Sequence, residues 1–269
     1  MKQIKKIIVH SGTFHADDVM CVAIMKSLYP GIQIERVSGS PKSVEDDVII
    51  ADIGQGRYDH HQKDAMLRED GKKYAACGLI YRDFGKHLFA TEEWYKDFRR
   101  KYIIPIEDSD NGGQGNPLSE MIMTCNPCWD DDMSLADKRF LEAVGVFLQL
   151  IKREQKMEQE ELRANPLIDS YIKNSVNREI VIMEKFVPWQ ENVCKTDAKF
   201  VIYPDFRGGY VLRSVPVVKN SGELRVPVLA KENMRGCTFA HANRFLAIFK
   251  TREQAVDAAN YILESMSEN

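Results

Sequence analysis

Three short apolar runs separated by one helical segment constrain the fold of this chain most strongly. Residues 4–9 and 32–37 predict strands, and the continuous apolar run within residues 47–53 predicts a third. Between the first two, residues 19–28 place apolar side chains at helical spacing, and Pro30-Gly31 ends the helix. Strands that are apolar throughout are typical of a parallel sheet covered by helices. We therefore expect an α/β fold with a mostly parallel sheet and flanking helices.

The rest of the chain predicts a second, smaller domain. Helical spacing recurs in residues 77–89, 92–102 and 134–163. Asn165-Pro166 is expected to end the last of these helices, and strands and turns predominate beyond it. They include a hairpin over residues 200–216 and a closing helix from Thr251. We predict a domain over residues 1–165 and a smaller α+β C-terminal domain over residues 175–269, which a chain of 269 residues can accommodate.

Composition narrows the class of protein. Charged residues make up 29% of the chain but its net charge is only -3. We therefore do not expect a protein that binds long nucleic-acid duplexes tightly, because such proteins usually carry a stripe of basic residues. No run approaches the ~18 apolar residues of a membrane span, and the N-terminus lacks a signal peptide. We therefore expect a cytoplasmic protein without a membrane partner. Cys125-Asn-Pro-Cys128 lacks the second cysteine pair of a zinc knuckle, so we expect no metal there.

Histidine and aspartate are concentrated in short segments that follow predicted strands. Four of the six histidines and two aspartates lie there: His10, His15, Asp17, Asp52, His60 and His61. Loops at the carboxyl ends of parallel strands form the ligand crevice of such sheets. Each residue also has a structural interpretation; Asp18, for example, is expected to cap the following helix. The combination of imidazole and carboxylate nevertheless predicts a site for Mn²⁺, Zn²⁺ or Fe²⁺.

An ordered set of motifs covers nearly the whole chain. It includes His10-Ser-Gly-Thr-Phe-His15-Ala-Asp17-Asp, Asp52-Ile-Gly, Arg57-Tyr-Asp59-His60-His61-Gln, Gly78-Leu-Ile-Tyr, Asp108-Ser-Asp110-Asn-Gly and Gly236-Cys-Thr-Phe-Ala-His241-Ala. With these motifs the chain resembles the Myg (melanocyte proliferating gene) family. That family is related to the DHH phosphoesterases, which include RecJ-type exonucleases, oligoribonucleases and manganese-dependent pyrophosphatases.

The resemblance implies a centre of two divalent metal ions. The implied ligands are His10, His15, Asp17, Asp52, His60 and Asp110. Asp52 is the expected bridging ligand, and Glu107 and Asp108 stay open as alternatives to Asp110. Asp59 is expected to orient the histidines, and His61 to support the ligands or contact a substrate phosphate. DHH proteins usually carry aspartate where this chain has His15, and this difference favours Mn²⁺ or Zn²⁺ over Mg²⁺. We expect Mn²⁺, with Zn²⁺ or Mg²⁺ as alternatives.

The implied activity is that of a metal-dependent phosphodiesterase. Two cations can activate water for attack on a phosphodiester, so no protein nucleophile is needed. The expected substrate is a short single-stranded RNA or oligonucleotide, cleaved by an enzyme that resembles 3′–5′ RNA exonucleases. A pyrophosphatase-like or other small-molecule phosphoesterase and a catalytically inactive metal-binding regulatory protein remain alternatives. A homo-oligomer is also left open.

The C-terminal domain is expected to bind the substrate. By the same resemblance, Arg213, His241 and Arg244 are the candidate contacts, because arginine can donate two hydrogen bonds to one phosphate. The chain departs from the related pattern after His241, where Asn243-Arg-Phe-Leu-Ala-Ile replaces Ser-Gly-Phe-Ile-Gly-Gly. The loss of these glycines weakens the expectation of a close backbone approach to substrate.

Overall fold

The structure, a computed structural model, describes residues 3–39, 41 and 45–267. The chain divides into two compact units, residues 1–158 and 159–269, which are considered separately below. One unit contains a parallel three-stranded sheet and the other a mixed five-stranded sheet, each with helices. The α/β class predicted from the sequence is therefore confirmed.

The first sheet is small and entirely parallel. Its strands are β1 (Lys6–His10), β2 (Gln33–Val37) and β3 (Val48–Ile50), in the order β2-β1-β3. Helix α1 (Ala16–Leu28) connects β1 to β2. Because β1 pairs in parallel with both neighbours, its carboxyl end and that of β3 lie at the same edge of the sheet.

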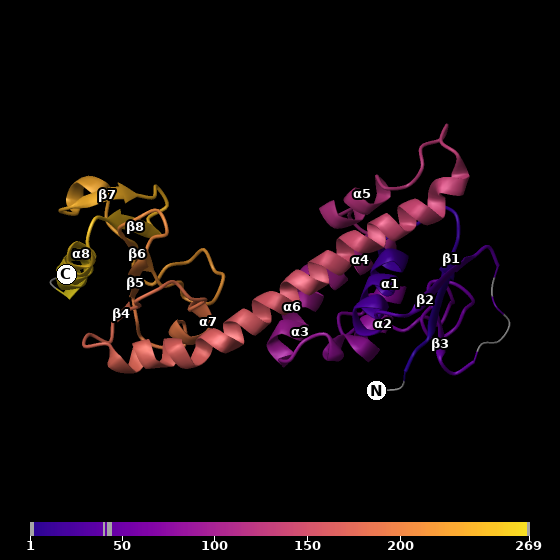
Figure 1. The fold of residues 1–269 in the computed structure, drawn as a ribbon, viewed down its shortest axis with the longest axis horizontal. Helices are drawn as coiled ribbons and strands as arrows, with labels where there is room; N and C mark the ends of the chain where they lie inside the picture. Colours follow the sequence, from indigo (N-terminus) through magenta and orange to yellow (C-terminus); the bar gives the residue numbers. More distant parts are fainter. Residues whose placement is uncertain (1–2, 40, 42–44, 268–269) are drawn as a thin grey trace. The chain divides into compact units, whose positions relative to one another are not determined.

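Helices cover this sheet and hold the core of the first unit (Figure 1). They are α2 (Ala76–Phe84), α3 (Glu92–Phe98), α4 (Ile104–Asp110) and α5 (Pro117–Met123). Helix α1 contacts α2, α4 and α5, and its residues 16–25 are all buried, as expected for a helix enclosed by others. A π-helical turn at Arg99–Ile103 joins α3 to α4.

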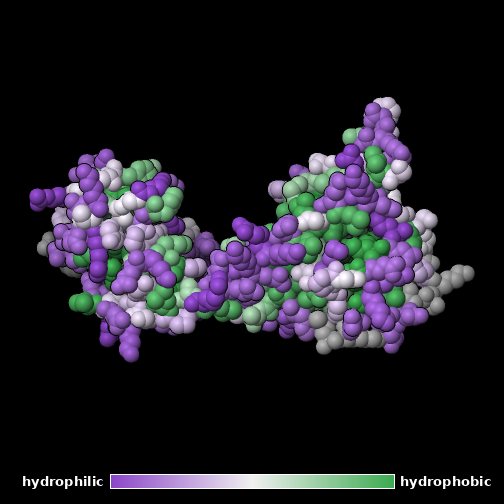
Figure 2. Space-filling view, in the orientation of Figure 1, coloured by the Kyte–Doolittle hydropathy of each residue, from purple (hydrophilic) through white to green (hydrophobic). Residues whose placement is uncertain are grey.

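Helix α6 (Ala136–Asn174) is longer than the sequence predicted. The expected end at Asn165-Pro166 is wrong, because Pro166 lies inside the helix. A proline within a helix costs about 3 kcal/mol, since it removes a hydrogen bond and crowds the preceding turn. Here Ala164 and Ile168 are buried in a hydrophobic cluster on either side of it, and this burial offsets part of that cost. Hydrophilic side chains line the exposed middle of α6 (Figure 2).

The second unit is built on a mixed sheet. Its strands are β4 (Ile180–Ile182), β5 (Phe200–Pro204), β6 (Tyr210–Ser214), β7 (Cys237–Ala240) and β8 (Leu246–Phe249), in the order β4-β5-β6-β8-β7. Only β4 and β5 pair in parallel. Helix α8 (Arg252–Ser267) contacts β5, β6 and β8, and α7 (Gln190–Val193) is a single turn. Alternate residues of β5 enter two separate hydrophobic clusters, so this strand is buried on both faces.

No helix in the described part of the chain has both the length and the apolar character needed to cross a membrane.

Candidate metal centre

His10 lies at the carboxyl end of β1 and faces two carboxylates. Its Nε2 atom is 3.3 Å from Oδ2 of Asp18 and 3.4 Å from Oδ2 of Asp52. The contact with Asp52 raises the pKa of His10 to about 9, although burial opposes this rise. Arg36, on β2, donates to the carbonyl oxygens of His10 and Gly12 and so fixes the start of the loop.

Two adjacent aspartates begin α1 and have different partners. Oδ1 of Asp18 accepts from the backbone N–H of His15 at 2.9 Å, which confirms that Asp18 caps the helix. Burial raises the pKa of Asp18 to about 7. Asp17 is fully buried and accepts from the N–H groups of Ala76 and Cys77, at 3.0 and 2.8 Å, at the start of α2. Burial and nearby carboxylates raise the pKa of Asp17 well above its ordinary value.

Asp52 follows β3 and lies between two imidazoles. Its Oδ1 is 3.2 Å from Nε2 of His60, while its Oδ2 faces Nε2 of His10. Burial opposes ionisation of Asp52, but contacts with His10 and His60 lower its pKa to about 2. The backbone of Asp52 has a φ of 57°, a left-handed conformation that costs on the order of 1 kcal/mol and persists only where the surroundings hold it. Its N–H donates to the carbonyl of Tyr58, which helps to hold this conformation.

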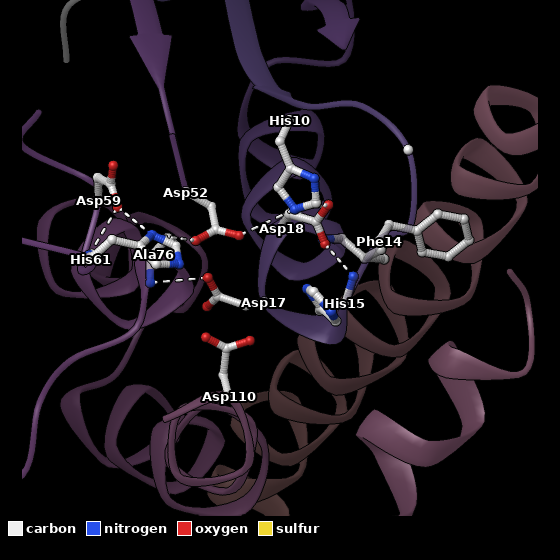
Figure 3. Close-up of polar contacts among 12 residues, drawn as sticks. His10, Phe14, His15, Asp17, Asp18, Asp52, Asp59, His61, Ala76 and Asp110 are labelled. Carbon is white, nitrogen blue, oxygen red and sulfur yellow. Dashed lines mark hydrogen bonds and ion pairs between the residues drawn. The ribbon is translucent and has the colours of Figure 1, made fainter. Parts of the chain in front are cut away.

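His60 is buried and contacts both Asp52 and Asp110. The side chains of Asp17, Asp52 and Asp110 lie next to one another at this point (Figure 3). Nε2 of His60 is 3.2 Å from Oδ1 of Asp52 and 3.1 Å from Oδ2 of Asp110. Burial disfavours the imidazolium, but hydrogen bonds with Asp110 and Asp52 raise the pKa of His60 to about 11. A divalent cation bound at Nε2 could take the place of this proton between the two carboxylates.

Asp59 orients His61 rather than His60. It accepts from Nδ1 of His61 at 2.7 Å and also from the backbone N–H groups of Gln55 and His61. Although burial works in the opposite direction, these hydrogen bonds lower the pKa of Asp59. The side chain of His61 is 61% exposed, so its remaining nitrogen is accessible to a substrate.

The three acids near the end of α4 have separate surroundings. Asp110 lines the pocket that also contains Asp17, Asp52 and His60. Glu107 is fully buried, and its Oε2 accepts from Arg68 at 3.2 Å. Asp108 pairs with Arg68 at 2.6 Å and with Lys72 at 2.8 Å. The structure therefore places Asp110, of these three, beside the candidate ligands.

A pocket of about 570 Å³ gathers most of the candidate site residues. They are His15, Asp17, Asp52, His60, His61 and Asp110. Two groups within the pocket could each hold a cation: Asp52, His60 and His61, and Asp17, His60 and Asp110. In each group the candidate ligand atoms lie within 4.8 Å of one another. His10 and His15 fall outside both groups, although His10 reaches Asp52 and the His15 ring lies 6.0 Å from that of His10.

Three buried polar atoms at this site meet partners only across histidine–carboxylate contacts of 3.1 Å or longer among the described residues: Oδ2 of Asp18, Oδ1 of Asp52 and Nε2 of His60. Buried polar atoms normally have well-formed hydrogen bonds, because leaving them without such bonds costs free energy. These atoms therefore indicate a place where a further group can bind. Divalent cations would satisfy the atoms on Asp52 and His60 directly. The mixed nitrogen and oxygen donors therefore fit Mn²⁺ or Zn²⁺.

The C-terminal candidates lie in the second unit around Phe245. The guanidinium carbon of Arg213 is 4.9 Å from the centre of the Phe245 ring, and the His241 ring is 4.1 Å from it. Arg244 has a φ of 55°, and its backbone oxygen accepts from the N–H of Val228. Contact of any of these residues with substrate stays a prediction.

Two asparagines that sequence reasoning missed hold the first unit's candidate site in shape. The side chain of Asn126 accepts from the N–H of Phe14 at 2.9 Å and donates to its carbonyl at 2.8 Å, which fixes the loop before α1. Asn111 contacts Nδ1 of His60. Asn126 lies inside the C-x-x-C segment and Asn111 directly follows Asp110, so each is next to a recognisable motif in the sequence.

Comparison with known proteins reveals similarity along nearly the whole chain. The profile of MYG1_exonuc, described as an uncharacterised protein family (UPF0160), matches residues 6–263. A "MYG1 protein" of Dictyostelium discoideum is 27% identical over an alignment of 308 positions, which covers 93% of this chain and 94% of the relative. The "MYG1 exonuclease" of Homo sapiens is 27% identical over an alignment of 328 positions, which covers 97% of this chain and 86% of the relative. A "MYG1 protein" of Schizosaccharomyces pombe is 25% identical over 324 residues, with 98% and 99% covered.

Proposed function

The chain belongs to the MYG1_exonuc family, and on that basis we propose that it is a metal-dependent phosphodiesterase of the DHH type. Its substrate is a short single-stranded RNA or a related oligonucleotide, hydrolysed from one end in the 3′–5′ direction. Curated relatives that carry the name exonuclease support the class of reaction. The protein works in the cytoplasm.

One observation carries this proposal: buried or half-buried carboxylates and imidazoles from four separate segments converge on one pocket. They come from the start of α1, the end of β3, the loop after it and the end of α4. Buried carboxylates so close together repel one another unless cations separate them. Without metal, the protonated imidazoles of His10 and His60 offset part of this repulsion, and divalent cations would take over that role. Cation binding would explain why these acidic side chains lie together.

Asp17, Asp52, His60 and Asp110 would hold the metal ions, with His10 and His15 as further ligands from the loop after β1. Asp52 would be the ligand that both ions share, because its two oxygens face different imidazoles. The donor set favours Mn²⁺, with Zn²⁺ or Mg²⁺ as alternatives. Two such ions supply an activated water molecule and neutralise charge on the phosphoryl group.

Asp59 and His61 contribute on the side of the substrate. The carboxylate of Asp59 accepts from Nδ1 of His61, so the imidazole is held in one orientation with Nε2 directed away from Asp59. From there the imidazolium form of His61 would donate a hydrogen bond from Nε2 to a phosphoryl oxygen. We place the catalytic domain at residues 1–165. The domain at residues 175–269 binds the substrate chain through Arg213, His241 and Arg244.

The proposal is tested with labelled short RNA, incubated with Mn²⁺ or with a chelator. Wild type is compared with Asp52→Asn, which removes one charge with little change in shape, and with Asp130→Asn as a control on an exposed loop. We expect Mn²⁺-dependent release of mononucleotides by wild type and the control, and a loss of at least 100-fold in Asp52→Asn. Cleavage that persists in chelator or in Asp52→Asn would contradict the proposal.

The same assay separates the alternatives. Phosphate release from pyrophosphate without nucleotide release from RNA would indicate a small-molecule phosphoesterase. Two bound metal ions per chain without turnover of any phosphoester in a broad panel would indicate a regulatory metal-binding protein. Sedimentation of the same samples would report a homo-oligomer.

A further inference from the structure

Lys73 is a cation that lines the otherwise acidic metal pocket. It lies there with Asp17, Asp52 and Asp110, yet no carboxylate pairs with it within the described ranges 3–39, 41 and 45–267. Its neighbour Lys72, by contrast, pairs with Asp108 at 2.8 Å. The charge of Lys73 is therefore available to a ligand.

Lys73 also lines a second cleft, of about 720 Å³, which shares Asn111 with the metal pocket. The other walls of this cleft are Lys72, Pro105, Asp108 and residues 113–116. The volume is within the range of about 300–1,000 Å³ that is usual for small-molecule sites. Because the two spaces share two residues, a ligand at the metal pocket could extend into the cleft.

The cleft has fixed walls. A Cβ atom at Gly113 would lie 2.4 Å from the backbone oxygen of Asp108, so the loop packs directly on the end of α4. The side chain of Asn116 donates to the carbonyl of Pro105 at 2.8 Å and accepts from N–H groups at the start of α5. The loop therefore keeps its shape before a ligand arrives, which lowers the entropic cost of binding.

Charge indicates what kind of ligand fits. Asp108 is the only acid that lines the cleft among the described residues, and Arg68 and Lys72 already pair with it. Lys73 thus gives the cleft a net positive charge. Lysine binds phosphate as a compact point charge and does not need a planar partner.

We propose that this cleft binds a second phosphate group of the substrate, adjacent to the one that is hydrolysed, through Lys73. The inference rests on the proposed function of the metal pocket. It assigns the enzyme a preference for oligonucleotides over esters that contain a single phosphate.

The experiment compares three uridine dinucleotides that differ by one group: without a terminal phosphate, with a 5′-phosphate and with a 3′-phosphate. Including both phosphorylated forms covers either direction of the chain in the site. The variants are Lys73→Ala, Lys73→Arg and the control Lys96→Ala, an exposed lysine of α3 that changes the net charge equally. KM and kcat are measured with Mn²⁺, and binding is measured by calorimetry with Ca²⁺ and without turnover.

We expect one terminal phosphate to lower KM in wild type and in Lys96→Ala. In Lys73→Ala the ratio of KM without the terminal phosphate to KM with it should fall by about 5- to 30-fold, while kcat changes less than 2-fold. Lys73→Arg should retain most of this ratio. For that dinucleotide the slope of log affinity against log salt should become shallower by about 0.7, the value for one phosphate contact on a single strand. A merely structural role for Lys73 would not change the slope by this amount.

A gain from the terminal phosphate that is the same in Lys73→Ala and in wild type would overturn the inference. So would equal losses for the phosphorylated and unphosphorylated dinucleotides. If wild type cleaves none of the three, the proposed function fails, but the calorimetric difference between them still tests the cleft.

Discussion

Nδ1 of His60 donates to Oδ1 of Asn111, and the two atoms lie 3.2 Å apart. The amide nitrogen of Asn111 donates to the carbonyl oxygens of Lys73 and Glu107, at 3.2 and 3.0 Å, so its oxygen must face the imidazole. In neutral His60 the proton is therefore on Nδ1. The lone pair of Nε2 is then directed toward Asp52 and Asp110, where a cation would bind.

Replacing Asn111 with alanine should weaken metal binding. Loss of a partner that orients a metal-binding histidine typically lowers affinity by about 10- to 100-fold, and we expect a decrease in that range for Mn²⁺. Calorimetry measures the affinity, and ¹⁵N NMR of the protein loaded with diamagnetic Zn²⁺ reports which nitrogen of His60 carries the proton. Asn174→Ala, at the exposed end of α6, is the control. An unchanged tautomer and affinity in Asn111→Ala would rule out this role.

Divalent metal should stabilise the folded protein. A ligand at 100 times its dissociation constant adds about 2.7 kcal/mol to the free energy of unfolding when it binds only the folded state. We expect Mn²⁺ to stabilise wild type by about this amount per site at that concentration, and chelator to reverse the effect. Thermal or urea unfolding of wild type and Asp52→Asn measures it. Equal stabilisation of both proteins would indicate that Mn²⁺ binds elsewhere.

Gly78 is required by its close approach to a buried acid. A Cβ atom at this position would lie 1.7 Å from Oε1 of Glu107. We expect Gly78→Ala to lower the free energy of unfolding by about 1–3 kcal/mol, as overpacked cores do. Because Gly78 lies on α2, whose first N–H groups bind Asp17, metal affinity should fall as well.

A matched glycine provides the control. Gly145 lies in α6 and has no atom within 4 Å of a Cβ placed on it. Gly145→Ala should therefore raise stability by about 0.5–1 kcal/mol, through the higher helix propensity of alanine. Urea unfolding measures both variants. Similar behaviour of the two would show that Glu107 moves aside without cost.

Glu107 should make stability depend on pH. Burial raises its pKa to about 7, and the nearby Arg68, Arg99 and the N–H of Ala75 only partly oppose this. Below the unfolded pKa, near 4.5, both states are protonated and the full contribution is present. As the pH rises from there through 7, the unfolded state releases its proton first, so the contribution is lost.

We therefore expect wild type to lose about 1–3 kcal/mol relative to Glu107→Gln between pH 4.5 and 8. Using this difference removes the effects of other groups, Asp108 included, that titrate in both proteins. Urea unfolding at several pH values measures it. A difference that is constant with pH would show that Glu107 is ionised throughout.

The sequence predicted the strand ends of the first unit because their apolar runs are continuous and end in polar residues. It could not indicate the direction of each side chain in Glu107-Asp-Ser-Asp110, because that depends on Arg68, 39 residues earlier than Glu107. Asn111 was missed for a related reason. Its role depends on contacts with His60 and Lys73, which lie far away in the sequence.

Elsewhere, tertiary packing overrode local signals. The three-residue β4 and the four-residue β7 are too short to be recognised as strands, and they form because β5 and β8 offer edges to pair with. Likewise, Pro166 predicts a helix end, but the helix continues because Ile168 gains a buried position.

Both candidate cation groups include His60. An imidazole nitrogen has one lone pair, and Nδ1 is occupied by Asn111, so only one cation at a time can bind this side chain. One of the two ions would therefore lack His60, and its ligands from these groups would be either Asp52 with His61 or Asp17 with Asp110. A titration with Mn²⁺ should consequently proceed in two separate steps, with one ion per chain bound first.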